Sequence, residues 1–68
     1  MELGELFKEA RRFGKIYIHS HDDGTYSCNI TANTSKGTSL EFKSGFKNAT
    51  PEEAVQNAIL AAKEFINV

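Results

Sequence analysis

A strictly alternating stretch at residues 25–33, TYSCNITAN, constrains the fold of this chain most. Its even-numbered positions carry Tyr, Cys, Ile and Ala, and its odd-numbered positions carry Thr, Ser and Asn. Successive side chains of a β-strand point to opposite faces, so the pattern predicts a strand with one buried and one solvent-facing side. Turn-forming residues stand on both sides of the stretch, and we therefore expect it at the centre of a small sheet.

The chain has 68 residues, which predicts a single domain (1–68) with a thin core. Its formal net charge is −1, without the basic excess of many nucleic-acid binders. Cys28 is the only cysteine, which excludes an intramolecular disulfide and suits a reducing cytoplasm. No apolar run approaches the roughly 20 residues of a membrane span, and the acidic start lacks the features of a signal peptide. We expect a cytoplasmic protein that does not enter a membrane.

The parity of the apolar positions predicts the strand register. Residues 15–21 also alternate, and a three-residue loop at 22–24 keeps the even-numbered side chains of both strands on one face. A second loop at 35–37 does the same for a third strand at about 38–44. Each loop ends in a glycine, which fits a type I turn followed by a bulge. The predicted inward-facing pairs are Ile16–Ile30, Ile18–Cys28, Ile30–Phe42 and Ala32–Leu40.

A helix is predicted on each side of the three strands. Apolar residues at helical spacing, with acidic residues in front and basic residues behind, indicate a helix at 2–13. Gly14 follows as the expected left-handed cap. Thr50 and Glu53 have the spacing of a capping box, which predicts a helix at 51–66 with proline at its first position.

The expected fold is α+β, a two-layer, three-stranded antiparallel meander with two helices packed on one face, in the order α-β-β-β-α. The helices are needed because the apolar face of the sheet requires a cover. The predicted core comprises Leu6, Phe7, Ala10, Phe13, Ile16, Ile18, Cys28, Ile30, Leu40, Phe42, Val55, Ile59, Ala62 and Phe65.

This element order resembles the double-stranded-RNA-binding domain over the whole chain. That family contacts RNA through its first helix, the loop after its first strand and a lysine-rich start to its last helix. Here the loop at 22–24 is Asp-Asp-Gly and the last helix begins Thr-Pro-Glu-Glu. Carboxylates would repel phosphate at two of the three contact regions. The resemblance therefore implies the fold but disfavours that mode of RNA binding.

The segment from Gly24 to Ile66 also resembles the strand-strand-helix arrangement of HicB-type antitoxins and other small phage or prophage accessory proteins. In those proteins a hairpin precedes a Thr-Pro-Glu-Glu-Ala helix start, as it does at residues 50–54 here. This resemblance implies a small bacterial or phage regulator and no particular activity.

The solvent-facing side of the sheet is the first candidate site. A partner protein would dock there through one exposed aromatic residue, Tyr17, ringed by polar groups. The plainer interpretation is a solvated face, as is typical of an antiparallel sheet covered on one side. The expected cross-strand rows are Lys15–Thr31–Glu41, Tyr17–Asn29–Lys43 and His19–Ser27, and the partner-binding candidates are Tyr17, His19, Asn29, Thr31, Glu41 and Lys43.

A basic patch at the end of the first helix is the second candidate site. Arg11, Arg12 and Lys15, together with Tyr17, would hold single-stranded nucleic acid by charge and stacking. Lys43 and Lys47 are candidates to extend the patch. The plainer interpretation is that these cations complement the helix dipole.

Residues with metal-binding or catalytic chemistry are sparse. His19 and His21 share a face, but no further Cys or His completes a metal site, so no metal and no cofactor are expected. Cys28 faces inward and is expected to be an inert core residue. The chain lacks a Ser-His-Asp spacing, a phosphate-binding glycine loop and an inward carboxylate pair, so no enzyme is expected.

The sequence thus predicts a small binding module, a protein-binding accessory or regulatory protein of phage or prophage type. Its partner would be another protein or a second copy, reached through the edge of the third strand or through the sheet face. The alternative is a nucleic-acid-binding module that uses the basic patch.

Overall fold

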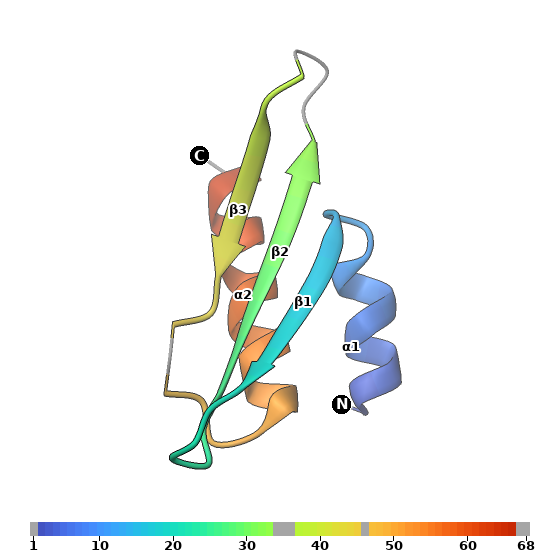
Figure 1. Ribbon diagram of the computed structural model, residues 1–68. Coiled ribbons are helices and arrows are strands. Elements are labelled where there is room, and N and C mark those ends of the chain that lie inside the picture. The colour runs from blue at the N-terminus through green and yellow to red at the C-terminus, as the bar shows by residue number, and fades with distance from the viewer. Residues whose placement is uncertain (1, 34–36, 46, 67–68) are drawn as a thin grey trace.

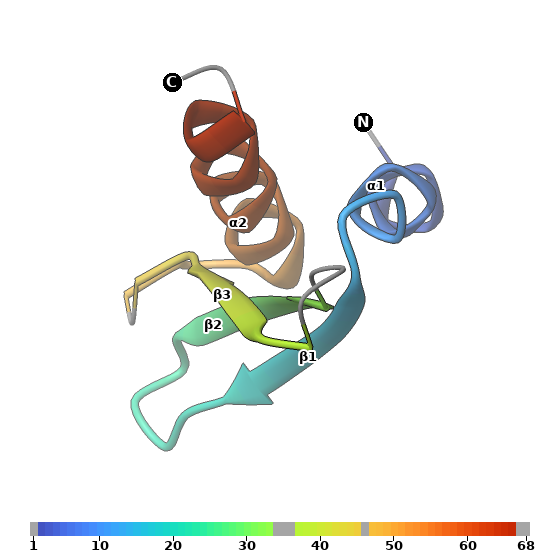
Figure 2. The same cartoon turned by 90° about the horizontal axis from the view of Figure 1, so that it is seen from above.

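The computed structural model describes residues 2–33, 37–45 and 47–66. Within these residues the elements are α1 (Leu3–Ala10), β1 (Lys15–Ser20), β2 (Tyr26–Asn33), β3 (Ser39–Lys43) and α2 (Pro51–Ile66). The strands form one antiparallel sheet in the order β1-β2-β3, which is visible in Figure 1. Figure 2 shows both helices on the same side of this sheet. The predicted α+β class and element order are confirmed.

The register is the one that side-chain parity predicts. At the first turn the Gly24 N–H donates to the His21 carbonyl at 3.1 Å, and the His21 N–H donates to the Thr25 carbonyl at 2.9 Å. With Gly24 at φ +84°, this is the expected type I turn and bulge. Gly37 also has a positive φ, of 80°, whereas Ser35 and Lys36 of the second predicted loop lie outside the described residues. The paired residues include Ile16–Ile30, Ile18–Cys28, Ile30–Phe42 and Ala32–Leu40.

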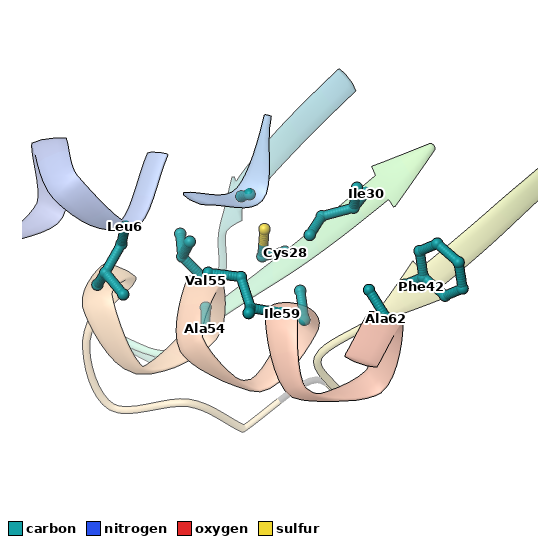
Figure 3. Close-up of a cluster of buried hydrophobic side chains, with 10 residues drawn as sticks. Leu6, Cys28, Ile30, Phe42, Ala54, Val55, Ile59 and Ala62 are labelled. Carbon is teal, nitrogen blue, oxygen red and sulfur yellow. The ribbon is translucent and has the colours of Figure 1, made fainter. Parts of the chain in front are cut away.

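The core lies mainly between β2 and α2. In Figure 3 the side chains of Val55 and Ile59 extend from α2 toward Cys28 and Ile30 on β2, and Leu6 reaches α2 from α1. Three alanines spaced by four residues, at 54, 58 and 62, keep the buried side of α2 narrow, so the helix approaches its neighbours closely. The buried apolar residues are Leu6, Ala10, Cys28, Ile30, Phe42, Ala54, Val55, Ala58, Ile59 and Ala62.

Two predicted core residues are wrong. Ile18 is 36% exposed, because it lies on an edge strand whose inner side is covered only in part by α1. Phe65 is 56% exposed in the last turns of α2, and its ring borders that of Phe42 at a centroid distance of 5.5 Å. The remaining predicted core residues outside the buried set are half-buried and pack against it: Phe7, Phe13, Ile16 and Leu40.

The first helix is shorter than the predicted span of 2–13, and Gly14 has a different role. Beyond Ala10 the chain tightens, with the Phe13 N–H donating to the Ala10 carbonyl at 3.0 Å. Gly14 does not have a positive φ, so the expected left-handed cap is wrong. A Cβ atom at this position would instead collide with the backbone carbonyl of Thr31. Glycine is required here because two backbone segments pass very close to one another.

A buried asparagine fixes the connection between β3 and α2, which the sequence predicts only as a loop. Asn48 is 3% exposed and pairs with Tyr26 through backbone bonds of 2.8 and 3.2 Å. Its Nδ2 donates to the carbonyl of Tyr26 at 2.9 Å and to Oγ of Ser44 at 3.1 Å. Its Oδ1 accepts from Nδ2 of Asn57 at 2.6 Å. One side chain thereby joins β2, the connection and α2.

The start of α2 uses the predicted capping chemistry. Oγ1 of Thr50 accepts from the Glu53 N–H at 3.1 Å, and the Glu53 carboxylate accepts from the Ala49 N–H at 3.4 Å. Both interactions satisfy backbone donors at the first helical turn of α2. The helix begins at Pro51 and ends at Ile66, as predicted.

Candidate functional site

The outer face of the sheet contains all six residues predicted to bind a partner. Strand pairing places Lys15, Thr31 and Glu41 in one row. The next row is Tyr17, Asn29 and Lys43, and His19 pairs with Ser27. Tyr17 is 49% exposed. Among the residues that the structure describes, this face therefore presents one exposed aromatic ring, that of Tyr17, between polar side chains.

The end of this face near the first turn is more enclosed than parity predicts. Ser27 is only 5% exposed, although it lies on the outward side. Nε2 of His21 is 3.2 Å from its hydroxyl, so the imidazole packs over it. His19, Ser27 and Lys43 help to line a hollow of about 440 Å³ here. Among the described residues, no group of three His, Cys, Asp or Glu side chains is placed to hold a metal ion.

A larger groove, of about 860 Å³, lies along β1 and extends at the start of this strand to Thr31 and Asn33 of β2. Phe7 of α1 and Arg11, directly after this helix, line it together with residues of β1 that include Ile16 and Ile18. Tyr17 lies at the border between this groove and the outer face of the sheet, because it lines the groove and also belongs to an outer row. Sequence periodicity does not reveal the groove, because its depth depends on where α1 lies relative to β1.

The backbone of β1 presents hydrogen-bonding groups to this groove. In an antiparallel pair, residues alternate between facing the neighbouring strand and facing away. The bond between His21 and Thr25 shows that odd-numbered residues of β1 face β2. The N–H and C=O groups of Ile16, Ile18 and Ser20 therefore point outward, and of these three residues Ile16 and Ile18 line the groove. Within the part of the chain that the structure describes, no hydrogen bond reaches these groups from α1 or from another segment.

The basic candidates divide between two places. Arg11 and Lys15 both line the groove, whereas Arg12 is exposed on the turn after α1 and does not line it. Lys43 lies on the outer face, with its Nζ 3.8 Å from a carboxylate oxygen of Glu41. Both side chains are well exposed, so this pair contributes little to stability. Three of the four nucleic-acid candidates, including Tyr17, thus meet in the groove.

Cys28 occupies the core position that the sequence predicts. Its side chain is fully buried beneath α2, and burial raises the pKa of the thiol to about 11. The reactive thiolate is therefore scarce near neutral pH.

The fold and these surfaces define a small two-layer α+β domain with a polar sheet face and a groove along one sheet edge. The chain matches no protein-family model, and no curated protein or solved structure is significantly similar to it. The resemblances to RNA-binding domains and to HicB-type proteins therefore remain interpretations of the element order and of one helix start. Neither helix in the described ranges combines the length and apolar character that crossing a membrane requires.

Proposed function

We propose that this chain is a non-enzymatic binding module that docks onto a partner protein through the outer face of its sheet. The exposure of Tyr17 carries the proposal: a 49% exposed aromatic ring lies between Lys15 and His19 along β1 and opposite Asn29 on β2. Aromatic residues are enriched at protein interfaces, where a few of them contribute most of the binding energy. Tyr17 is the expected anchor, and the polar rows around it form the rim.

The chemistry of the nucleophilic side chains supports binding rather than catalysis. The Cys28 thiol is buried and has a pKa of about 11, which disfavours the thiolate. The Ser27 hydroxyl is also buried, with His21 as its neighbour at the end of the sheet. Neither group lines the groove of about 860 Å³ beside β1.

An accessory or regulatory role of phage or prophage type belongs to the same proposal. The Thr-Pro-Glu-Glu-Ala start of α2, which follows a hairpin as in HicB-type proteins, supports it. A cytoplasmic location is part of the proposal as well. Its support is a buried free thiol at Cys28, which suits a reducing compartment.

Nucleic-acid binding is the second candidate function, since Arg11, Lys15 and Tyr17 line one groove. Cations beside an aromatic ring can hold a single strand by charge and stacking. Three features weigh against nucleic-acid binding: the acidic residues in the turn between β1 and β2, the acidic start of α2 and the net charge of −1. Protein binding is therefore the function that the geometry supports best.

Affinity capture from an extract of the organism that encodes the chain tests the proposal. The tagged wild type, Tyr17→Ala and Gln56→Ala are compared after nuclease treatment; Gln56 is exposed on α2 and serves as the matched control. A protein retained by the wild type and the control, but reduced at least about tenfold by Tyr17→Ala, supports the proposal. Equal retention by all three chains would contradict it.

A gel shift separates the second candidate. If the groove binds single-stranded nucleic acid, the shift weakens steeply between low and physiological salt and disappears with Arg11→Ala. If no shift occurs at low salt, nucleic-acid binding is excluded.

A further inference from the structure

We infer that the groove beside β1 binds an extended, acidic segment of the partner protein as a fourth strand of the sheet. This inference rests on the proposed protein-binding function and names the form of its ligand. Three observations carry it: the outward backbone groups of β1, the apolar side chains beside them and the charge of the groove.

The backbone of β1 supplies a hydrogen-bonding ladder. The outward groups belong to Ile16, Ile18 and Ser20, and residues two apart on a strand are separated by roughly 6.6 Å. A peptide in the β conformation presents N–H and C=O groups with the same repeat. A phosphodiester backbone has no matching donors, so a peptide fits this edge better than a nucleic acid.

The side chains along the edge suit an alternating peptide. Ile18 is 36% exposed on the inner side, next to half-buried Ile16, and Phe7 of α1 also lines the groove. Side chains of an added strand would alternate between this apolar side and the polar side near Tyr17. Apolar residues at every second position would complete the cover that α1 leaves open.

The charge of the groove selects an acidic ligand. Arg11 and Lys15 line it, and no carboxylate stands among the described residues that do so. This local excess of positive charge occurs in a chain whose net charge is −1. Carboxylates of a partner segment would pair with both cations. A second copy is a poorer ligand, because pairing β1 with β1 would bring two cationic grooves together.

The other sheet edge lacks this combination. The exposed side chains of β3 include Glu41 and Lys43, which form a pair of opposite charge. A segment approaching there meets no excess charge, and the groove beside β1 offers the stronger complementarity.

Selection of peptides tests the inference without knowledge of the partner. A displayed library of random nine-residue peptides is selected on the immobilised full chain. The expected winners alternate apolar residues with Asp or Glu. An enriched set without acidic bias, or no enrichment at all, would overturn the inference.

Amide hydrogen exchange on the complex with a selected peptide locates the ligand. The amides of Ile16 and Ile18 are expected to exchange at least about tenfold more slowly in the complex, because they gain partners. Protection confined to β3 would refute the location. Slow exchange in the free chain that appears only at high protein concentration would point to a second copy as the occupant. Protection by a single-stranded oligonucleotide in place of peptides would identify nucleic acid.

Variants on both sides of the contact sharpen the test. Arg11→Glu is expected to weaken peptide binding at least about tenfold. Gln56→Glu, which adds a carboxylate at an exposed position of α2 that does not line the groove, is expected to change it less than about twofold. Two further peptides are also tested, one methylated at the backbone nitrogens of its odd-numbered residues and one at those of its even-numbered residues. One of these two peptides is expected to lose binding, because only alternate N–H groups of an added strand face β1. If both methylated peptides still bind, strand addition is excluded. Because only the peptide is changed, this test does not affect the fold of the protein.

The two proposals fail separately. If a cellular partner depends on Tyr17 but leaves the Ile16 and Ile18 amides unprotected, the strand-addition inference is wrong and the proposed function stands. If acidic peptides bind at β1 but Tyr17→Ala leaves capture of cellular proteins unchanged, docking through the sheet face is wrong.

Discussion

β1 and β3 are both edge strands of one sheet, but the helices cover them to different extents. On β3, Phe42 is 7% exposed and belongs to the buried core. On β1, Ile18 is 36% exposed, and no residue of the strand is fully buried. Figure 2 shows α2 lying over β2 and β3, with α1 displaced toward the outer side of β1. The helices therefore cover the β3 edge of the sheet, the closed side, whereas a groove remains beside the β1 edge, the open side.

Helix length accounts for much of this difference. The 16 residues of α2 span about 24 Å, whereas the 8 residues of α1 span about 12 Å, at about 1.5 Å per residue. The six residues of β1 extend over roughly 20 Å, so α1 is too short to cover the strand. Leu6 and Ala10 join the core that α2 organises, and Glu9 pairs with Lys63 of α2 at 2.7 Å. A short helix held by its neighbour thus leaves the strand edge accessible.

Shortening one isoleucine in the core beneath α2 and one on β1 tests this difference in helix cover most directly. Ile30→Ala removes a fully buried side chain and is expected to cost about 3–5 kcal/mol. A domain of this size has a total free energy of unfolding of roughly 3–10 kcal/mol. Ile30→Ala is therefore expected to remove a large part of this stability. Ile18→Ala, the matched variant on the open side, is expected to cost less than about 1 kcal/mol. Urea unfolding followed by circular dichroism measures both, and equal losses would show that the helices cover Ile18 as completely as Ile30.

Removing the buried amide probes how strongly the closed side is fixed. Asn48→Ala leaves the Asn57 amide without its acceptor and removes the Nδ2 bonds to Tyr26 and Ser44. The expected loss is about 2–3 kcal/mol, because buried polar groups lose their partners. Asn29→Ala, at a half-buried outer position, serves as the control and is expected to cost less than about 1 kcal/mol. A loss for Asn48→Ala no greater than for the control would mean that the network adds little.

Gly4, inside α1, and Gly14, after it, separate the effect of close packing from that of helix propensity. Gly14→Ala places a methyl group against the Thr31 carbonyl and is expected to destabilise the domain by about 1–2 kcal/mol. Gly4→Ala meets no atom within 4 Å and lies inside α1, where it is expected to stabilise by up to about 1 kcal/mol. Thermal unfolding of both variants gives the signs. Destabilisation by both would show that α1 itself, rather than the contact with β2, is sensitive.

Local chemistry explains which parts of the fold the sequence could predict. The register follows from parity, because a slip by one residue would expose Cys28 and Ile30. The bounds of α2 follow from Thr50, Pro51 and Glu53, which act within one turn of the chain. These features need no knowledge of how distant segments meet.

The sequence does not predict features that depend on how distant segments of the chain pack together. The exposure of Ile18 depends on the reach of α1, and the need for Gly14 depends on the path of β2. Asn48 resembles any loop asparagine until Tyr26 and Asn57 are placed around it. The rows of the candidate site were predictable from parity, whereas the groove was not, because α1 and β1 enclose it only after packing.

The smallest expected effect concerns the first turn, where Asp23 tests how far the open side depends on charge. The hydroxyl of Thr25, and next its N–H at 3.0 Å, donate to the Asp23 carboxylate and lower its pKa below the ordinary value. Because the pKa is lower in the folded chain, the stabilisation is fully present above the unfolded pKa of about 3.9. It is lost as the pH falls through the folded value. Between about pH 5 and pH 3 the wild type should therefore lose slightly more stability than Asp23→Asn, which keeps an acceptor oxygen without the charge.

Asp22→Asn is the matched control for this turn. It removes a carboxylate one residue away and leaves the bonds between Asp23 and Thr25 in place, so this variant should keep the stabilisation by Asp23 and lose it over the same pH range as the wild type. Urea unfolding at several pH values measures the slopes. Identical slopes for the wild type and Asp23→Asn would show that the charge of Asp23 contributes nothing to folding. The turn between β1 and β2 would then be held by Gly24 and by interactions that do not depend on the charge of Asp23, among them the backbone bonds of His21.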